Sequence, residues 1–312
     1  MGYILALCAA LLFGTNGSVT KVVIGAGLEP AQLTLFRVGG TALFAALFLI
    51  LRNRAAFKVS RRQLLRLIIL GIFGVALLQY SYAVAIGLLP IGITLLIEYT
   101  AVLMVAIVAF FFFKEKVRPR LWIAIGLVLV GLAVVAQIWA SALLPFGVLM
   151  AFLAAVCLAI YFLLGEREVG KSSAMSVAFW TMSTSTVFWL IFSGWWRINP
   201  ALFVTPVSLN GNLDAVHLPL WVPLAWNVVL GSFVPFYLSL LALKYLTATA
   251  AGIVASAEVI FAFLVAWIWL GETLNPVQIA GAAVVLLGIV LAQTARIDKV
   301  VDADLAIKLD EP

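Results

Sequence analysis

The chain has 312 residues, of which 65% are hydrophobic and 10% are charged, and its formal net charge is +6. A soluble domain of this length cannot cover so much apolar surface with so few polar residues, so the composition indicates an integral membrane protein. The apolar residues come in runs of about 20, the length that a helix needs to cross the bilayer, and not in the short alternating segments of an outer-membrane barrel.

The apolar runs predict ten transmembrane helices in an all-α membrane protein, mostly joined by very short connections. The first run lacks a basic leader and is followed by further spans, which favours an uncleaved helix over a signal peptide. The long connection at 195–217 begins with Trp195 and Trp196, residues typical of the membrane interface. Its Asn-Gly-Asn turn and Pro206 give it no helical pattern, so we expect an ordered or mobile loop. The predicted spans are 2–24, 31–52, 64–86, 91–113, 121–139, 143–165, 175–194, 218–243, 249–270 and 276–295.

Two long segments of the chain, 88–135 and 245–291, resemble each other. An offset of 157 residues aligns Glu115 with Glu272 without a gap, and polar and helix-breaking positions coincide as well as apolar ones, which indicates a duplication. We predict a first five-helix repeat at 1–140, a second at 141–295 and a polar tail at 296–312. The same offset pairs Pro119 with Pro276, Gly131 with Gly288, Ala109 with Ala266, Gly74 with Gly231, Tyr80 with Tyr237 and Ala85 with Ala242.

The basic residues lie almost entirely on one side of the predicted topology. The other side carries only Lys21 and Arg197, and Arg37 lies within a span. By the positive-inside rule, both termini and the even-to-odd connections are cytoplasmic, so the excess of basic residues reflects topology and predicts no nucleic-acid partner. The cations of the basic side are Arg52, Arg54, Lys58, Arg61, Arg62, Arg66, Lys114, Lys116, Arg118, Arg120, Arg167, Lys171, Lys244, Arg296, Lys299 and Lys308.

Five spans in each repeat is an odd number, so the second repeat is expected to be inserted in the opposite orientation to the first. Inverted repeats are typical of secondary transporters, which bind their substrate near the midplane and expose it to each side in turn. The predicted topology therefore favours a transporter.

Two carboxyl groups, those of Glu98 and Glu258, are predicted to lie near mid-membrane. A charged side chain there costs about 2.5–3.5 kcal/mol on insertion scales, so each is expected to face the bundle interior or a water-filled cavity. A protonated glutamate that serves only packing is the alternative. The repeat alignment places Glu98 on Ala255 and Glu258 on Ala101, so the two are related without being strictly equivalent.

Further polar and aromatic residues inside the spans are candidates for binding substrate or protons. Arg37 either snorkels to the interface or pairs with a carboxylate and lines the path. Single aromatic residues in a bundle more often pack than bind, although the duplication gives Tyr80 and Tyr237 more weight. Pro235, a turn after Gly231, predicts a kink and a freed carbonyl in the eighth span. The remaining candidates are Asn16, Tyr99 and Trp180, with Tyr82, Tyr161 and Asn227 as weaker ones.

Enzymatic constellations are missing from the sequence. The single histidine, His217, lies in or beside the long connection, which argues against histidine-based triads and HExxH metal sites. Cys8 and Cys157 lie inside spans without metal-ligand spacing, and no Walker motif is present. We expect no enzyme, no metal and no cofactor.

Three stretches carry a resemblance to a known family: EPAQLTLFR, EYTAVLMVAIVAFFFFKEK and SAEVIFAFLVAWIWLGETLNPVQIAGAAVVLLGIVL. They resemble the two EamA domains of the drug/metabolite transporter superfamily, over about 2–140 and 143–295. The resemblance implies ten helices in two inverted five-helix repeats around a central cavity, and transport of amino acids, amines, nucleobases or other small metabolites, often outward.

The most recognisable mark of this resemblance is a glutamate before the final helix of each half, Glu115 and Glu272. Both are expected to make capping or loop contacts near the interfaces and not to bind substrate. Val102 and Val259 stand where proline is common in relatives, which argues against a helix break at either place.

The interior charges indicate the class of solute. Two carboxyl groups and one guanidinium suit a zwitterion, an amine or a neutral heterocycle better than an anion, and the absence of several interior cations argues against phosphorylated cargo. Burial favours the neutral form of a carboxyl group, so proton exchange by Glu98 or Glu258 is a hypothesis.

We therefore expect a secondary active transporter in the plasma or bacterial cytoplasmic membrane, an exporter or proton-coupled exchanger of small metabolites such as amino acids. The alternatives are an uncoupled small-solute channel and a non-transporting membrane scaffold or enzyme. The expected partners are the solute and the lipid bilayer, and the sequence is compatible with a monomer without fixing the oligomeric state.

Overall fold

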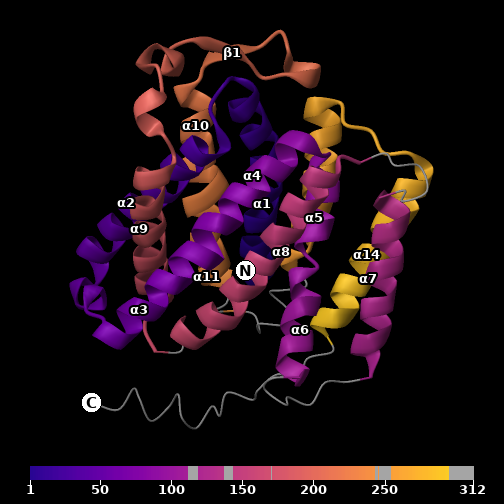
Figure 1. The fold of residues 1–312 in the computed structure, drawn as a ribbon, viewed down its shortest axis with the longest axis horizontal. Coiled ribbons are helices and arrows are strands. Elements are labelled where there is room, and N and C mark those ends of the chain that lie inside the picture. Colours follow the sequence, from indigo (N-terminus) through magenta and orange to yellow (C-terminus); the bar gives the residue numbers. More distant parts are fainter. Residues whose placement is uncertain (112–118, 137–142, 170, 243–244, 246–253, 295–312) are drawn as a thin grey trace.

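The computed structural model describes residues 1–111, 119–136, 143–169, 171–242, 245 and 254–294, which form a helical bundle (Figure 1). Six of its helices are long and apolar enough to cross a membrane: Gly2–Gly25, Pro30–Arg52, Arg61–Leu88, Pro145–Val169, Ala174–Phe192 and Trp221–Ser239. Four shorter apolar stretches, read through the breaks and π-helical turns given below, are Ile91–Val105, Arg120–Val135, Ala257–Leu270 and Pro276–Ala292.

Each predicted span overlaps a helix or a run of helical segments, although the start of the ninth lies outside the described residues. The α-helices are α1 Gly2–Gly25, α2 Pro30–Arg52, α3 Arg61–Ile69, α4 Leu77–Leu88, α5 Ile91–Glu98, α6 Ala101–Phe111, α7 Arg120–Ala136, α8 Pro145–Val169, α9 Ala174–Phe192, α10 Trp221–Val228, α11 Val234–Ala242, α13 Ala257–Val265 and α14 Pro276–Gln293. The π-helical segments are η2 Leu70–Ala76, η6 Val229–Phe233 and η7 Ala266–Leu270, and the 3₁₀ turns are η1 Arg54–Phe57, η3 Trp195–Arg197, η4 Pro200–Phe203 and η5 Gly211–Leu213.

Local sequence signals explain where several helices begin. Capping boxes open α2, through Glu29 and Gln32, and α14, through Asn275 and Gln278, and each is followed by a proline in the first turn. The hydroxyl of Ser173 accepts a hydrogen bond from the Ser176 amide at the start of α9. These caps fix the helix starts at points that the apolar runs leave open.

Helix α7 packs along α14, α2 along α9, and α1 lies against α11 and α13. Figure 1 shows α7 and α14 together at the right-hand edge of the bundle. A Cβ at Gly131 would lie 2.9 Å from the Gly281 carbonyl oxygen, and one at Gly288 would lie 3.0 Å from the Ala124 carbonyl oxygen. The two glycines thus let α7 and α14 approach closely through reciprocal contacts.

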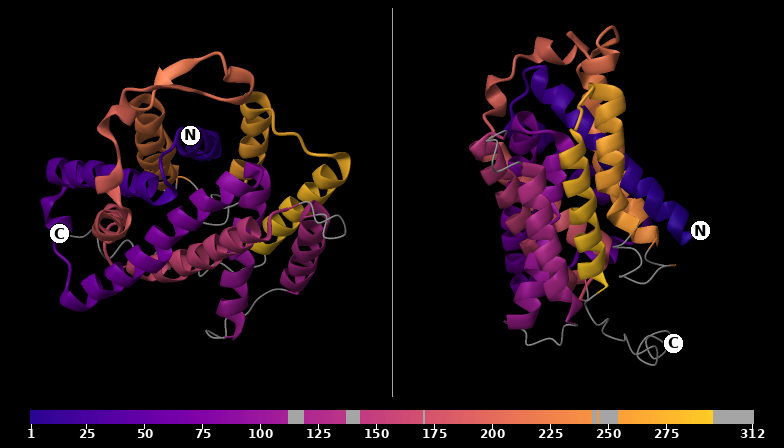
Figure 2. Two further views of the ribbon diagram at one scale, coloured as in Figure 1. Left: turned by 45° about the horizontal axis from the view of Figure 1, so that its top comes forward. Right: turned by 90° about the vertical axis from the view of Figure 1, so that its right-hand side faces the viewer.

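The connection at 195–217 is an ordered loop, one of the two forms that were expected, and its short elements were not predicted. It contains 3₁₀ turns, and β1, Pro206–Ser208, pairs antiparallel with β2, His217–Pro219. It arches over one end of the bundle (Figure 2), where Asn212 Nδ2 donates to the Ile268 carbonyl at 2.9 Å and Trp269 Nε1 to the Leu209 carbonyl at 2.8 Å. We call this end of the bundle the loop end.

The opposite end of the bundle, where α2 ends and α3 and α9 begin, is held by polar contacts and is called the basic end. The buried carboxylate of Glu168 lies 3.2 Å from Arg66 Nη1 and 2.9 Å from Lys171 Nζ. The hydroxyl of Ser176 donates to the Ala56 carbonyl at 2.6 Å, which ties α9 to η1. Most of the described lysine and arginine residues lie at this end of the bundle, and few lie at the loop end.

The fourth and ninth spans are interrupted, so the expectation of unbroken helices at Val102 and Val259 was wrong. The Val102 amide donates to the Tyr99 carbonyl at 3.1 Å, and the Val259 amide donates to the Ser256 carbonyl at 3.2 Å. Each bond reaches back three residues instead of four, which tightens the helix into a 3₁₀-like turn. A valine can make this break because its own N–H closes the turn, and no proline is needed.

Candidate functional site

Arg37 turns from α2 toward the π-helix η6 in the middle of the bundle. Its Nε donates to Ser232 Oγ at 2.7 Å, and its Nη2 donates to the Gly231 carbonyl at 3.4 Å. Pro235 has no N–H to offer that carbonyl four residues back, so the freed acceptor that the sequence predicted is engaged by Arg37. The guanidinium is therefore held inside the bundle and does not snorkel to an interface.

The two mid-membrane carboxyl groups flank the 3₁₀-like turns of the fourth and ninth spans. Glu98 ends α5 and is 9% exposed, and its Oε2 has no hydrogen-bond partner among the described residues. Glu258 lies in the first turn of α13, and its Oε2 accepts a hydrogen bond from the Tyr99 hydroxyl at 2.7 Å. Both carboxyl groups lie close enough to Arg37 to interact with it electrostatically.

Helix α1 carries a seam of polar side chains against the eighth span. Asn227 Nδ2 donates to Thr20 Oγ1 at 2.7 Å, while Asn227 Oδ1 and Asn16 Oδ1 are buried without a partner among the described residues. A Cβ at Gly231 would overlap Asn16 Oδ1, so only glycine lets the chain pass there. Gly231 thus joins two groups of polar residues, since its carbonyl contacts Arg37 and its Cα lies beside Asn16.

We refer to these side chains together as the polar cluster. Tyr82 belongs with them because it is buried against the helix that carries Asn16 and Thr20, where a Cβ at Gly17 would lie 3.2 Å from its hydroxyl oxygen. Ser232 was not predicted, although its place between Gly231 and Pro235, in the predicted kink, was the signal that could have indicated it. The cluster consists of Asn16, Thr20, Arg37, Tyr82, Glu98, Tyr99, Asn227, Ser232 and Glu258.

Three other predicted site residues have their contacts elsewhere. The ring of Tyr80 lies 5.0 Å from that of Trp189, near the loop end. Tyr237 packs beside Phe48, at 5.4 Å between ring centroids, in an apolar group near the basic end. Trp180 lies in an apolar group with Leu67, Leu70 and Val177, and its indole N–H has no partner in the described part of the chain.

Glu272 makes the contacts expected of a capping residue. Its Oε2 accepts a hydrogen bond from the Ile91 amide at the start of α5, at 2.9 Å, and its Oε1 lies 2.5 Å from Lys21 Nζ. The expected capping contact of Glu272 is therefore present, while Glu115 lies outside the described residues.

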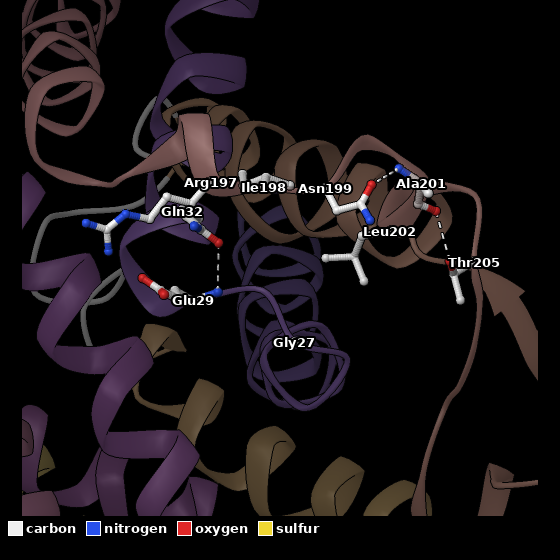
Figure 3. A pocket seen from close by; sticks show the side chains of 9 residues that line it. All are labelled: Gly27, Glu29, Gln32, Arg197, Ile198, Asn199, Ala201, Leu202 and Thr205. Carbon is white, nitrogen blue, oxygen red and sulfur yellow. Dashed lines mark hydrogen bonds between the residues drawn. The ribbon is translucent and has the colours of Figure 1, made fainter.

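Two adjoining pockets open at the loop end. One, of about 350 Å³, is lined among others by Glu29, Gln32, Arg197 and Asn199 (Figure 3). The other, of about 580 Å³, shares Glu29 and Arg197 with it and extends past Tyr80. Neither pocket includes a residue of the polar cluster. Across the described ranges, no three His, Cys, Asp or Glu side chains group together as a metal site would require.

The profile of the EamA-like transporter family matches residues 1–137 and 145–294. An uncharacterized transporter of Archaeoglobus fulgidus is 27% identical over 289 residues, which cover 91% of this chain and 93% of that protein. The threonine/homoserine exporter RhtA of Escherichia coli K12 is 28% identical over 281 residues, 86% of this chain and 82% of the exporter. A solved crystal structure with 16% identity has a similar fold, with a TM-score of 0.63 over 99% of both chains.

Proposed function

Because the chain belongs to the EamA-like transporter family, we propose that it is a secondary active transporter of small zwitterionic, amine or neutral metabolites, an exporter or proton-coupled exchanger that works by alternating access. The chain is a multi-pass membrane protein with several apolar helices. The single observation that carries the proposal is the buried Glu98, which has an unpartnered carboxylate oxygen beside the inward-turned Arg37.

We propose that alternating access comes from two inverted five-helix repeats, at 1–140 and 141–295. The repeat-paired residues Tyr80 and Tyr237 support this because one lies near the loop end and the other near the basic end. Further support comes from the reciprocal contacts of Gly131 and Gly288 between α7 and α14. The excess of cations at the basic end supports a cytoplasmic location of that end and of both termini.

The polar cluster suits a cargo that carries both charges. Its buried oxygens without a donor, on Asn16, Glu98 and Asn227, would accept hydrogen bonds from an ammonium group. Arg37 would attract a carboxylate. An amino acid combines the two groups, and the relative named as a threonine/homoserine exporter supports amino acids of this size as cargo.

We further propose that Glu98 exchanges a proton with the cargo. Burial away from water favours the neutral form of a carboxyl group, whereas a donated hydrogen bond favours the charged form. Tyr99 donates such a bond to Glu258, and Glu98 Oε2 receives none from the described residues. This difference supports Glu98 as the group that takes up a proton when the cargo leaves.

Counterflow in proteoliposomes tests the proposal. Vesicles loaded with unlabelled L-threonine are diluted into labelled L-threonine at several pH values, and the same assay is run with other amino acids, amines and nucleobases. We expect saturable uptake in the wild type and strongly reduced, pH-independent uptake in Glu98→Gln. Asp214→Asn, a carboxylate of the exposed loop, is the matched control and should behave as the wild type.

The same experiment separates the alternatives. If Glu98→Gln and Glu258→Gln both leave uptake and its pH dependence unchanged, the coupling proposal fails. Flux that does not saturate and exceeds carrier rates would identify a channel. No flux with any compound, in protein that melts cooperatively and shows no ligand-induced rise in Tm, would favour a scaffold.

A further inference from the structure

The two pockets at the loop end share a pair of opposite charges. Glu29, which precedes α2, and Arg197, in η3, line both pockets. No ion pair joins the two side chains among the described residues. Figure 3 shows both side chains at the wall of the smaller pocket. A carboxylate and a guanidinium therefore line the same two pockets without forming an ion pair with each other.

An unsatisfied polar atom lies beside this charge pair. Ser193, at the end of α9, is 2% exposed, and its Oγ has no hydrogen-bond partner among the described residues, yet it lines the larger pocket. A buried hydroxyl without a partner costs free energy unless a ligand or water satisfies it. The lining of the larger pocket thus includes the hydroxyl residue Ser193, the carboxylate of Glu29 and the guanidinium of Arg197.

The rest of the larger pocket is apolar and mostly aromatic. Its wall includes Tyr80, Phe188, Trp189, Phe192 and Trp196. Phe192 is one of the lining residues and is 63% exposed. An apolar group bound in the pocket would therefore cover a ring that now faces solvent or lipid. Sites for small molecules combine such apolar walls with a few convergent polar groups.

We propose that the loop end holds a second binding site, distinct from the polar cluster, for a small zwitterion with an apolar side chain. The carboxylate of the ligand meets Arg197, its ammonium group meets Glu29, and its side chain lies among Tyr80, Phe188 and Phe192. The inference rests on the proposed function in one respect, namely that cargo passing between the polar cluster and the outside would pause here. The inference also gives a role to Tyr80, which contacts Trp189 and lines this pocket instead of joining the polar cluster.

Equilibrium binding to the purified full chain in detergent tests this site with three probes of one skeleton: L-phenylalanine, 2-phenylethylamine and 3-phenylpropionate. The variants are Arg197→Gln, Glu29→Gln, Arg37→Gln in the polar cluster and, as the matched control, Asp214→Asn, a loop-end carboxylate that lines neither pocket. Glutamine keeps an oxygen that can accept the capping bond at the start of α2, and circular dichroism checks that each variant folds. A lost charge-assisted hydrogen bond corresponds to about a tenfold or greater change in affinity.

We expect L-phenylalanine to bind more tightly than either analogue. Arg197→Gln should weaken the binding of L-phenylalanine and of 3-phenylpropionate at least about tenfold. Glu29→Gln should weaken the binding of L-phenylalanine and of 2-phenylethylamine. Asp214→Asn should retain the binding, and Arg37→Gln should not remove the part of the binding that depends on Arg197. The inference is overturned, with the proposed function intact, if Arg37→Gln abolishes binding while Arg197→Gln does not. It is also overturned if the wild type binds none of the probes, or if native mass spectrometry shows a phospholipid that is retained by the wild type and lost in Arg197→Gln. Binding that depends on Arg197 in a protein without any flux would keep the site and refute the transporter.

Discussion

The π-helices η2 and η6 lie at matching positions of the two halves, since the repeat offset pairs Gly74 with Gly231, but their carbonyls are satisfied differently. In η2, Ser185 Oγ donates to the Gly71 carbonyl at 2.7 Å and Trp189 Nε1 to the Ala76 carbonyl at 3.3 Å, both from α9. In η6, the Gly231 carbonyl accepts from the Arg37 guanidinium on α2. One half closes its π-helix with neutral groups and the other with a charge.

This difference suits the proposal that two repeats share one backbone feature and that the second repeat uses it to hold a charge. A π-bulge leaves carbonyls out of the regular helical ladder, and such bulges occur often at functional sites. Within the described residues, η2 is bonded by neutral side chains and η6 by the guanidinium of Arg37. We propose that the side chain that fills the bulge decides whether it serves structure or transport.

Removing the side-chain donor that contacts each π-helix tests this comparison, and the change at η6 has the largest expected effect. Arg37→Gln removes the charge at η6, and we expect flux of the transported amino acid in proteoliposomes to fall by about 100-fold, the upper range for losing a charged hydrogen bond. Ser185→Ala is the matched change at η2. It should cost about 1 kcal/mol of stability and retain most of the flux. Equal loss of flux in both variants would contradict the functional difference between the two bulges.

A smaller effect is expected from the paired glycines. Gly231→Ala would push a methyl group into Oδ1 of Asn16, a member of the polar cluster, whereas Gly74→Ala would meet Leu70 Cδ1 at 2.8 Å and the Cα of Tyr161 at 3.1 Å. Overpacking of this kind costs about 1–3 kcal/mol in either case. We expect both variants to lower Tm but only Gly231→Ala to lower the affinity for cargo, by about tenfold. Measuring Tm and binding for the two variants side by side decides this, and unchanged affinity in Gly231→Ala would remove Asn16 from the site.

The 3₁₀-like turns extend the comparison, because Tyr99 at the first turn donates to Glu258 after the second. Tyr99→Phe removes this donor, and losing a donor disfavours the charged carboxylate. Because we propose Glu98 and not Glu258 as the group that exchanges the proton, we expect the pH at which flux is half-maximal to stay unchanged and maximal flux to fall by no more than severalfold. The measurement is a pH profile of counterflow, with Tyr3→Phe as the control because Tyr3 is 58% exposed on α1. A half-maximal pH that moves upward would show that Glu258 titrates during transport and would contradict the assignment of the proton to Glu98.

Much of the fold follows from the sequence because hydrophobic runs and caps act locally. The spans and the special status of Glu98, Glu258 and Arg37 were predicted, since mid-membrane charges stand out in an apolar run. Which groups meet across the bundle was not predicted. The bonds from Tyr99 to Glu258 and from Arg37 to Ser232 join residues 159 and 195 positions apart, and nothing local encodes them.

The interruptions of the helices, apart from the kink predicted at Pro235, also escaped the sequence, for a different reason. The turns at Tyr99 and Ser256 and the π-helix η2 use ordinary residues in altered hydrogen-bond registers, so their composition carries no mark. Reasoning from the missing prolines at Val102 and Val259 treated proline as necessary for a break. The pairing of β1 with β2 was likewise decided by the fit of the 195–217 connection onto η7 and not by alternation in the sequence.

The smallest effect concerns the glutamates before the last helix of each half, of which Glu272 is described. Its ion pair with Lys21 is partly exposed, at 33% for the lysine side chain and 18% for the glutamate, so solvent screens it. Glu272→Gln keeps an oxygen for the Ile91 amide and loses only the charge, which should cost less than about 1 kcal/mol and vanish near 1 M salt. Glu272→Ala loses the cap as well and should cost about 1 kcal/mol more. Thermal melts of both variants at low and high salt separate the two contributions. A loss of several kcal/mol in Glu272→Gln, unaffected by salt, would mean that the charge itself, and not the cap, joins α1 to α5 at the loop end.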